Sequence, residues 1–257
     1  MIPFFRKIRK KMADDNRPLK YARYAIGEIV LVVIGILIAL QINTWNNQQI
    51  EKRHEQKVLM GLHETFSNNL ENLNGIMDMS YNTFNSSKTL LSMMGPNASD
   101  FTTREVDSLI YHLINYSTYD PSTGTVDNII NSGKLNIIQN EVLKVNISNW
   151  FGMLEDTKKD INIANSHCFD VMIIYLNDKI NLKNIAVPKR VTEVTQLDIT
   201  RASHFPANYD LIMRSKEFEN LVDFHALNFN YLIREYLKIK VYLEENIALL
   251  EQEIQES

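Results

Sequence analysis

Cysteine, proline and glycine are all scarce in this chain. Its 257 residues include one cysteine, Cys168, together with six prolines and eight glycines. A single cysteine excludes an intrachain disulfide and argues against a disulfide-stabilised scaffold. We expect Cys168 to behave as a small buried apolar residue. Proline and glycine are typical of turns, so their scarcity favours a few long helices over a fold with many strands.

No cluster of basic residues follows residue 24. The first 24 residues carry eight basic and two acidic side chains, a net charge of +6. The whole chain has a formal net charge of −4 and Glu28 contributes −1, so residues 29–257 carry −9. An acidic body without a basic stripe predicts no nucleic-acid partner. The basic residues that we expect to set membrane topology and to contact anionic lipids are Arg6, Lys7, Arg9, Lys10 and Lys11.

Motifs for familiar chemistry are missing as well. His54-Glu55 and His63-Glu64 resemble halves of a zinc-protease motif, but that motif needs two histidines four residues apart. The segment Asn131–Leu135 (NSGKL) resembles the end of a phosphate-binding loop but lacks both the earlier glycine and the Ser or Thr that binds magnesium. No nucleophile elbow is present. We therefore predict no catalytic residue, no metal site and no cofactor.

One long apolar run is present, over residues 25–42. As a helix rising 1.5 Å per residue, these residues cover about 27 Å, close to the thickness of the hydrocarbon core of a bilayer. Tyr21 and Tyr24 precede the run and Trp45 follows it, as interfacial aromatic anchors do. We predict an uncleaved transmembrane helix over residues 25–45.

Two alternatives to a membrane span are weaker. A cleaved secretory signal needs a short basic region and a small-residue cleavage site, and neither is present. A soluble core helix rarely follows so many cations directly. By the positive-inside rule, residues 1–24 form a basic cytoplasmic tail and residues 46–257 lie outside the cytoplasm. The best other apolar run, Phe169–Leu176, is too short to span, so we predict a single-pass protein.

The N-terminal residues also carry a resemblance. The stretches FFRKIRKK and YAIGEIVLVVIGILIALQINTWN resemble the N-terminal signature of an uncharacterised family of single-pass membrane proteins common in Bacteroidota. The similarity is close over residues 3–50 and looser over Ile129–Leu143 and the C-terminal helix. It implies a protein of the inner membrane of a Gram-negative bacterium with a helical periplasmic region. It implies no activity.

Beyond the span, apolar residues recur every three or four positions, as on helices. The first predicted helix continues to about Met94, before Gly95-Pro96. Its stripe consists of Leu59, Leu62, Phe66, Leu70, Leu73, Met77, Tyr81, Phe84 and Leu91. Thr102-x-x-Glu105 predicts a capping box for a short helix. Gly133 is expected to end another short helix, over residues 125–132.

Two further long helices are predicted over residues 140–180 and 215–255, with a connecting loop over residues 182–208. The buried candidates of the first are Val142, Leu143, Ile147, Trp150, Leu154, Ile161, Phe169, Met172, Ile173 and Leu176. Those of the second form a near-heptad series: Val222, Phe229, Leu232, Tyr236, Ile239, Leu243, Ile247, Leu250 and Ile254. His225 lies on this stripe, either as a buried core histidine or as a pH switch. We predict an all-α fold in which one N-terminal transmembrane helix precedes an elongated antiparallel helical bundle.

Glu28 is the one charged residue inside the span. A carboxylate at the bilayer centre costs roughly 2.5–3.5 kcal/mol, and less near the edge, where Glu28 lies. Glu28, Gly35 and Ala39 share one helix face, and Gly35 and Ala39 form a small-residue pair that lets helices approach. Three interpretations stay open. They are interfacial placement without function, a contact with a second copy or a partner membrane protein, and an ion-conducting role.

Three functions are compatible with these features. The first is a membrane-anchored periplasmic interaction or sensing module without catalytic activity, whose partners are lipids and either a second copy or another membrane protein. The second is a scaffold or accessory subunit of an envelope complex, and the third is an enzyme with an unfamiliar site. A cavity with convergent polar groups favours a sensor, whereas a solid bundle with an exposed apolar patch favours a scaffold.

Replacing Gly35 with leucine tests the predicted helix contact in the membrane. The larger side chain should hold neighbouring helices apart and so reduce self-association or partner capture in a membrane two-hybrid assay. Association equal to that of the unchanged chain would contradict a contact on this face.

Overall fold

The computed structural model describes residues 18–185, 203–205 and 208–255. Every described element is a helix and no β-strand occurs among these residues, which confirms the all-α class. The predicted basic tail residues Arg6, Lys7, Arg9, Lys10 and Lys11 lie outside the described residues, as does most of the predicted loop over residues 182–208. The side chains of Tyr21 and Tyr24 also lie outside them.

The first helix, α2, runs without a break from Pro18 to Met93. The prediction that the apolar segment continues directly into the next helix is therefore confirmed. The chain divides into two compact units, residues 1–57 and residues 58–257. Within the described residues, α2 is the one helix long and apolar enough to cross a membrane, and its most apolar stretch is uncovered.

The second unit contains the remainder of α2 and all the other described elements. The α-helices are α3 (Thr103–Ile114), α4 (Gly124–Asn131), α5 (Glu141–Ser166), α6 (Ile173–Lys179), α8 (Asp210–Met213) and α9 (Lys216–Gln255). The 3₁₀ turns are η1 (Lys134–Ile137) and η3 (Leu182–Asn184), and η2 (His167–Met172) is a π-helical turn. The predicted helix over residues 140–180 is thus α5, η2 and α6 in direct succession.

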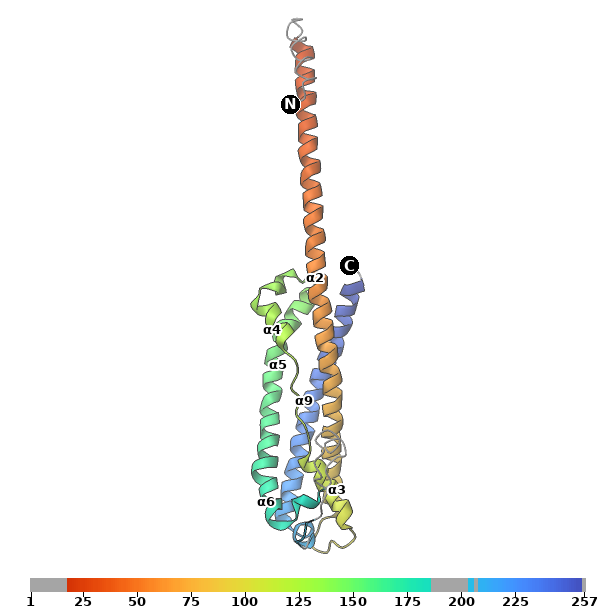
Figure 1. Ribbon diagram of the computed structural model, residues 1–257, viewed down its shortest axis with the longest axis vertical. Coiled ribbons are helices and arrows are strands. Elements are labelled where there is room, and N and C mark those ends of the chain that lie inside the picture. Colours follow the sequence, from red (N-terminus) through yellow and green to blue (C-terminus); the bar gives the residue numbers. More distant parts are fainter. Residues whose placement is uncertain (1–17, 186–202, 206–207, 256–257) are drawn as a thin grey trace. The chain divides into compact units, whose positions relative to one another are not determined.

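Helices α5 and α9 pack lengthwise in opposite directions (Figure 1). Near the start of α5, the Asn146 side-chain amide donates to Asn246 Oδ1 at 2.8 Å. Further along the chain, in α6, the hydroxyl of Tyr175 donates to that of Ser215 at 2.8 Å. As the residue number rises on one helix it falls on the other, so this pair is antiparallel.

The part of α2 in the second unit also runs opposite to α9, as the pairs His63–Glu251 and Asn74–Lys240 indicate. It follows that α2 and α5 run in the same direction. A connector over residues 115–123 makes this possible, because it returns the chain from the end of α3 to the start of α4 (Figure 1). The long helices therefore do not simply alternate in direction, and the predicted antiparallel bundle is not confirmed as a whole.

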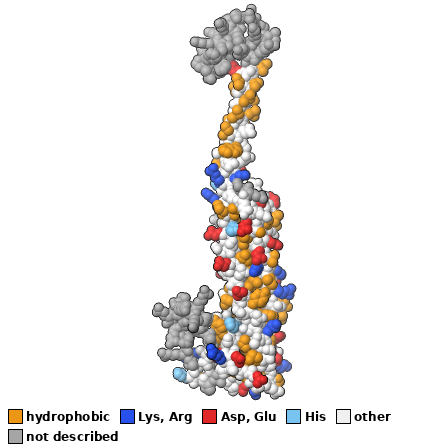
Figure 2. All heavy atoms as spheres, turned by 90° about the vertical axis from the view of Figure 1, so that its right-hand side faces the viewer, with side chains coloured by type: hydrophobic (Ala, Val, Ile, Leu, Met, Phe, Trp, Pro, Cys, Tyr) orange, Lys and Arg blue, Asp and Glu red, His pale blue; other side chains and the backbone are white. Residues whose placement is uncertain are grey.

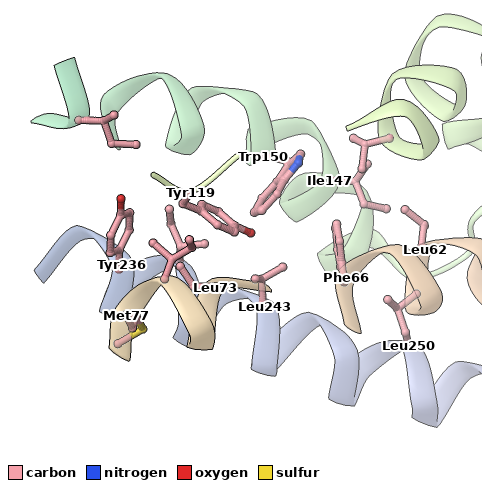
Figure 3. Close-up of a cluster of buried hydrophobic side chains, with 14 of the residues drawn as sticks. Leu62, Phe66, Leu73, Met77, Tyr119, Ile147, Trp150, Tyr236, Leu243 and Leu250 are labelled. Carbon is pink, nitrogen blue, oxygen red and sulfur yellow. The ribbon is translucent and has the colours of Figure 1, made fainter. Parts of the chain in front are cut away.

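The main core lies where α2, α5 and α9 meet, and side chains from all three helices point toward one another there (Figure 3). Phe66 contacts Trp150 with ring centroids 5.5 Å apart, and Trp150 stacks on Tyr242 at the same distance. The fully or nearly fully buried residues that the sequence predicted include Leu59, Leu62, Phe66, Leu73, Leu143, Ile147, Trp150, Phe229, Leu232, Tyr236, Ile239, Leu243 and Leu250. The spacing of apolar residues in the sequence thus identified the faces of α2, α5 and α9 that pack together.

Toward the end of α2 the predicted stripe is wrong. Tyr81 is exposed and Phe84 only partly buried, whereas Ser80, Thr83 and Ser87 are buried. The Ser80 and Ser87 hydroxyls each donate to the carbonyl four residues earlier, and the Thr83 hydroxyl shares its one hydrogen between the carbonyls of Met79 and His112. Small side chains on this face let another helix approach α2 closely, and α3 does so at Thr83.

Two predicted helix ends are confirmed. The Thr102 hydroxyl accepts the Glu105 main-chain N–H at 3.2 Å while the Glu105 carboxylate accepts the Thr102 N–H at 2.8 Å, which completes the capping box. Gly133 has φ of +73°, in the left-handed region that glycine adopts freely, and its N–H donates to Ile130. Because Gly133 serves to end α4, the NSGKL segment needs no phosphate-binding role.

Replacing Phe66 with alanine should destabilise the second unit by about 3–5 kcal/mol, because it empties space between Trp150 and Tyr242. Thermal unfolding followed by tryptophan fluorescence measures the change. Met60 on the same helix is half exposed, so alanine there serves as the control and should change stability little. Equal effects of the two variants would contradict the described core.

Candidate functional site

The predicted membrane face lies on the first unit's part of α2. Gly35 and Ala39 are exposed, Glu28 is partly exposed, and an added Cβ at Gly35 would meet nothing within 4 Å. Trp45, the predicted interfacial anchor, is 61% exposed. The continuous helix places Glu28, Gly35 and Ala39 on one face, as their spacing of seven and four residues requires. Among the described residues of this unit, no second element covers Gly35 or Ala39.

A buried polar cluster surrounds the end of α3 in the second unit. The last carbonyl groups of a helix have no intrahelical partner, and α3 ends inside the body, with Leu113 fully buried. His225 Nε2 lies 3.0 Å from the Leu113 carbonyl oxygen and donates to it. The Cys168 thiol reaches the same oxygen at 3.8 Å, and the Thr83 hydroxyl donates to the His112 carbonyl at 2.8 Å. Side chains from α2, η2 and α9 thus complete the end of α3.

The π-helical turn η2 explains which side chains enter this cluster. His167 and Cys168 begin this turn, which inserts an extra residue into the helix, and both are buried. The same shift turns Phe169 outward, so its predicted burial is wrong. Val142, also predicted to be buried, is exposed beside buried Leu143. The expectation that Cys168 is a small buried residue is confirmed.

The cluster is held in neutral form. Burial, together with the neighbouring His167 ring at 5.6 Å, lowers the pKa of His225 to about 3. Burial also lowers the pKa of His167, whose Nε2 donates to the Leu221 carbonyl at 2.9 Å. Burial raises the pKa of Cys168 to about 11, so the thiol stays protonated. Neutral histidines and a protonated thiol that cap carbonyl groups favour the core-histidine interpretation of His225 over a pH switch.

The histidines that resembled a zinc motif are not brought together. His63 Nε2 lies 3.3 Å from a carboxylate oxygen of Glu251 on α9, at the surface of the bundle. His54 belongs to the first unit. Among the described residues, no group of three or more His, Cys, Asp or Glu side chains is arranged to hold a metal ion.

An open groove of about 690 Å³ lies between the connector and α5. One wall is formed by Thr118, Tyr119 and Asp120 of the connector, and the other by residues of α5 from Phe151 to Asn165. Apolar and polar groups alternate along it, with partly buried Leu154 and buried Ile161, Thr157 and the exposed charges of Glu155 and Lys158 among them. Its volume lies within the range of ligand sites, but the groove is open and most of the residues that line it are polar.

The connector that forms one wall is attached at both ends. The Tyr116 hydroxyl donates to the Asn165 side chain at 2.9 Å. The Asn69 side-chain amide pairs with both main-chain groups of Ser122, at 2.9 and 2.8 Å, and Asn69 itself is buried. The buried ring of Tyr119 lies between these points and packs on Tyr236. The wall is therefore held in place by side chains of α2, α5 and α9.

No pattern in the sequence predicted this groove. One signal was present. Gly152 lies inside α5, where glycine costs about 1 kcal/mol relative to alanine. It is exposed in the groove and an added Cβ would meet nothing within 4 Å, so packing within the chain does not require it.

Comparison with known proteins identifies one family. A model of a family of unknown function, DUF6090, matches residues 28–171, which is more than half of the chain. The matched residues include the apolar segment of α2 and both walls of the groove. No curated protein and no solved structure matches the chain.

The buried histidines predict acid sensitivity. The unfolded chain binds a proton at His225 below about pH 6.5, whereas the folded chain does so only near pH 3. The unfolded state therefore holds more protons across this window, and the free energy of unfolding falls as the pH falls through 6.5. One such group contributes at most about 1.4 kcal/mol per pH unit.

His225→Gln tests this effect, since glutamine retains a side-chain N–H for the Leu113 carbonyl and does not titrate. Urea midpoints measured between pH 7 and pH 5 should depend less steeply on pH in this variant. An equally steep dependence would show that His225 does not cause the acid sensitivity.

Proposed function

The chain belongs to the DUF6090 family, whose function is unknown, and we propose that it is a single-pass, membrane-anchored module that binds a partner outside the cytoplasm. In this proposal it has no catalytic activity of its own. The body, residues 46–257, acts as a helical bundle that presents a binding surface, and residues 25–45 anchor it. The proposal also covers a sensing role for the same surface, because a sensor must bind the molecule that it detects.

The uncovered apolar stretch of α2 carries this proposal. Its apolar side chains are exposed over a length that matches a bilayer, and a contiguous exposed apolar surface of this kind belongs in lipid or against another protein. In a bilayer Trp45, with Tyr21 and Tyr24 at the other end, would lie at the two interfaces. Glu28, Gly35 and Ala39 would face a second copy or a partner membrane protein.

Charge and resemblance support the orientation. The net charge of +6 on residues 1–24 favours a cytoplasmic N-terminus, in which Arg6, Lys7, Arg9, Lys10 and Lys11 contact anionic lipids. The resemblance of the N-terminal segments to a family common in Bacteroidota supports the inner membrane of a Gram-negative cell and hence a periplasmic body.

The surface of the body supports binding rather than catalysis. On the face shown in Figure 2, acidic, basic and apolar side chains are interspersed along the second unit, with no single-sign field that would steer a nucleic acid. The groove beside the connector offers polar groups that converge on a concave surface, as a sensing or binding module requires. The buried titratable groups at the end of α3 are all neutral and engaged with carbonyls, which suits a structural role.

A scaffold or accessory subunit is the second candidate. Large apolar side chains are also exposed on the body, among them Ile163, Ile174 and Phe224. An exposed apolar surface on an otherwise solid bundle suits permanent docking in an envelope complex. In that case the span face would contribute to assembly as much as the body does.

Affinity purification separates the two candidates. The full chain, tagged at its C-terminus, is purified from detergent-solubilised membranes, and co-purifying proteins are identified by mass spectrometry. A matched variant carries an unrelated apolar span in place of residues 25–45. A binding module should retain its partner when the span is exchanged, because the body makes the contact.

Loss of the partner on span exchange would instead support the accessory subunit, since the contact then lies in the membrane. Recovery of the chain alone from both preparations would contradict both candidates. The recovered amounts should be compared at equal expression, so that a poorly inserted variant is not mistaken for one that lost its partner.

A further inference from the structure

The main chain of the connector has hydrogen-bonding groups that the body does not use. Between the contact at Tyr116 and the pairing at Ser122, the N–H and C=O groups of residues 117–120 form no hydrogen bond with any described residue. This stretch lies in no helix or 3₁₀ turn. Unpaired main-chain groups in a row, as on the edge of a sheet, are a template for pairing with another extended chain.

The connector is also held in place before any partner binds. Asn69 fixes its Ser122 end through two hydrogen bonds, the Tyr116 hydroxyl fixes its other end on α5, and Tyr119 is buried between them. A wall that is already ordered loses little conformational freedom when a partner adds to it. The unpaired groups are therefore presented by a preformed surface.

The opposite wall leaves room beside these groups. Gly152 is exposed in the groove, and the space where its side chain would lie is empty. A chain that approaches α5 at this position therefore meets no side chain, and its main chain can come close to the helix. From Phe151 to Asn165 the wall is about 21 Å long, enough for about six residues of an extended chain.

We propose that the groove between the connector and α5 binds an extended polypeptide segment of a partner protein, which pairs its main chain with residues 117–120. The inference rests on the proposed function and names the chemistry of its partner. Main-chain pairing supplies affinity, and alternate side chains of the segment lie against Leu154 and Ile161 or toward the charges of Glu155 and Lys158.

The main-chain groups of residues 117–120, which form no hydrogen bond with a described residue, favour an extended segment over a helical one as the ligand of the groove. A helical segment has already paired its own main-chain groups and would bury an apolar face in the groove, leaving residues 117–120 unpaired. An extended segment satisfies them. Strand pairing also has a signature of its own, because successive N–H groups of a strand point to opposite sides and only alternate ones pair with a given neighbour.

Peptide selection tests the proposal. A phage library of random linear peptides is selected against the full chain in nanodiscs, and an enriched peptide is synthesised and measured by fluorescence anisotropy. Its N-methylated forms, one position at a time, should lose binding at every second residue and keep it at the residues between. Gly152→Leu should weaken binding by about tenfold or more, because the added side chain fills the groove.

Gly75→Leu is the matched control, because Gly75 is an exposed glycine of α2 with equally open space and lies outside the groove. It should bind the peptide as the unchanged chain does. Melting followed by circular dichroism confirms that both variants fold, and the N-methyl pattern, measured on the unchanged chain, does not depend on either variant.

Three results would overturn the proposal. They are the absence of any enriched peptide, binding unaffected by Gly152→Leu, and binding insensitive to the position of the N-methyl group. Loss of self-association in Gly152→Leu without any peptide binding would assign the groove to a second copy instead. Each of these can occur while a partner is still retained after span exchange, so the failure of this inference is distinguishable from failure of the proposed function.

Discussion

The carbonyl group of Leu113 is the point on which the described body depends. Helix α3 ends inside the protein, and a buried carbonyl without a donor costs about 1–3 kcal/mol. His225 from α9 and Cys168 from η2 both reach this oxygen, and Thr83 from α2 reaches the carbonyl before it. The demand for donors at one helix end thus brings together three elements that are far apart in sequence.

The course of the chain after α3 follows from that end. Because α3 stops within the body, the chain must return past α5 before α4 can begin, and it does so in extended form over residues 115–123. That return makes α2 and α5 parallel to each other. It also creates a wall of main chain beside a helix, with the groove between them. The candidate binding surface is therefore formed by the segment that returns the chain from the end of α3.

Much of the fold could be predicted from the sequence, where a regular period governed burial. The near-heptad series of α9 and the stripe from Leu59 to Met77 marked the buried faces, because uniform helices keep apolar residues on one side. The prediction failed where packing overrode hydrophobicity. Ser80 and Thr83 are buried in place of Tyr81 and Phe84. A helix packed closely against α2 leaves room only for small side chains, and these hydroxyls can form hydrogen bonds with main-chain carbonyls of the preceding turn. Phe169 is exposed because a π-turn changed the period, and the apolar pattern carries no sign of that change.

The sequence by itself determined the helical class, the long apolar segment of α2 and the ends of helices at Thr102 and Gly133. Each of these depends on local chemistry: apolar length, a side-chain cap and a left-handed glycine. Only the tertiary structure decided the partners of His225 and Cys168, the direction of α5 relative to α2 and the groove at Gly152. Each of these depends on contacts between elements that are far apart in the sequence, and no local pattern encodes such contacts.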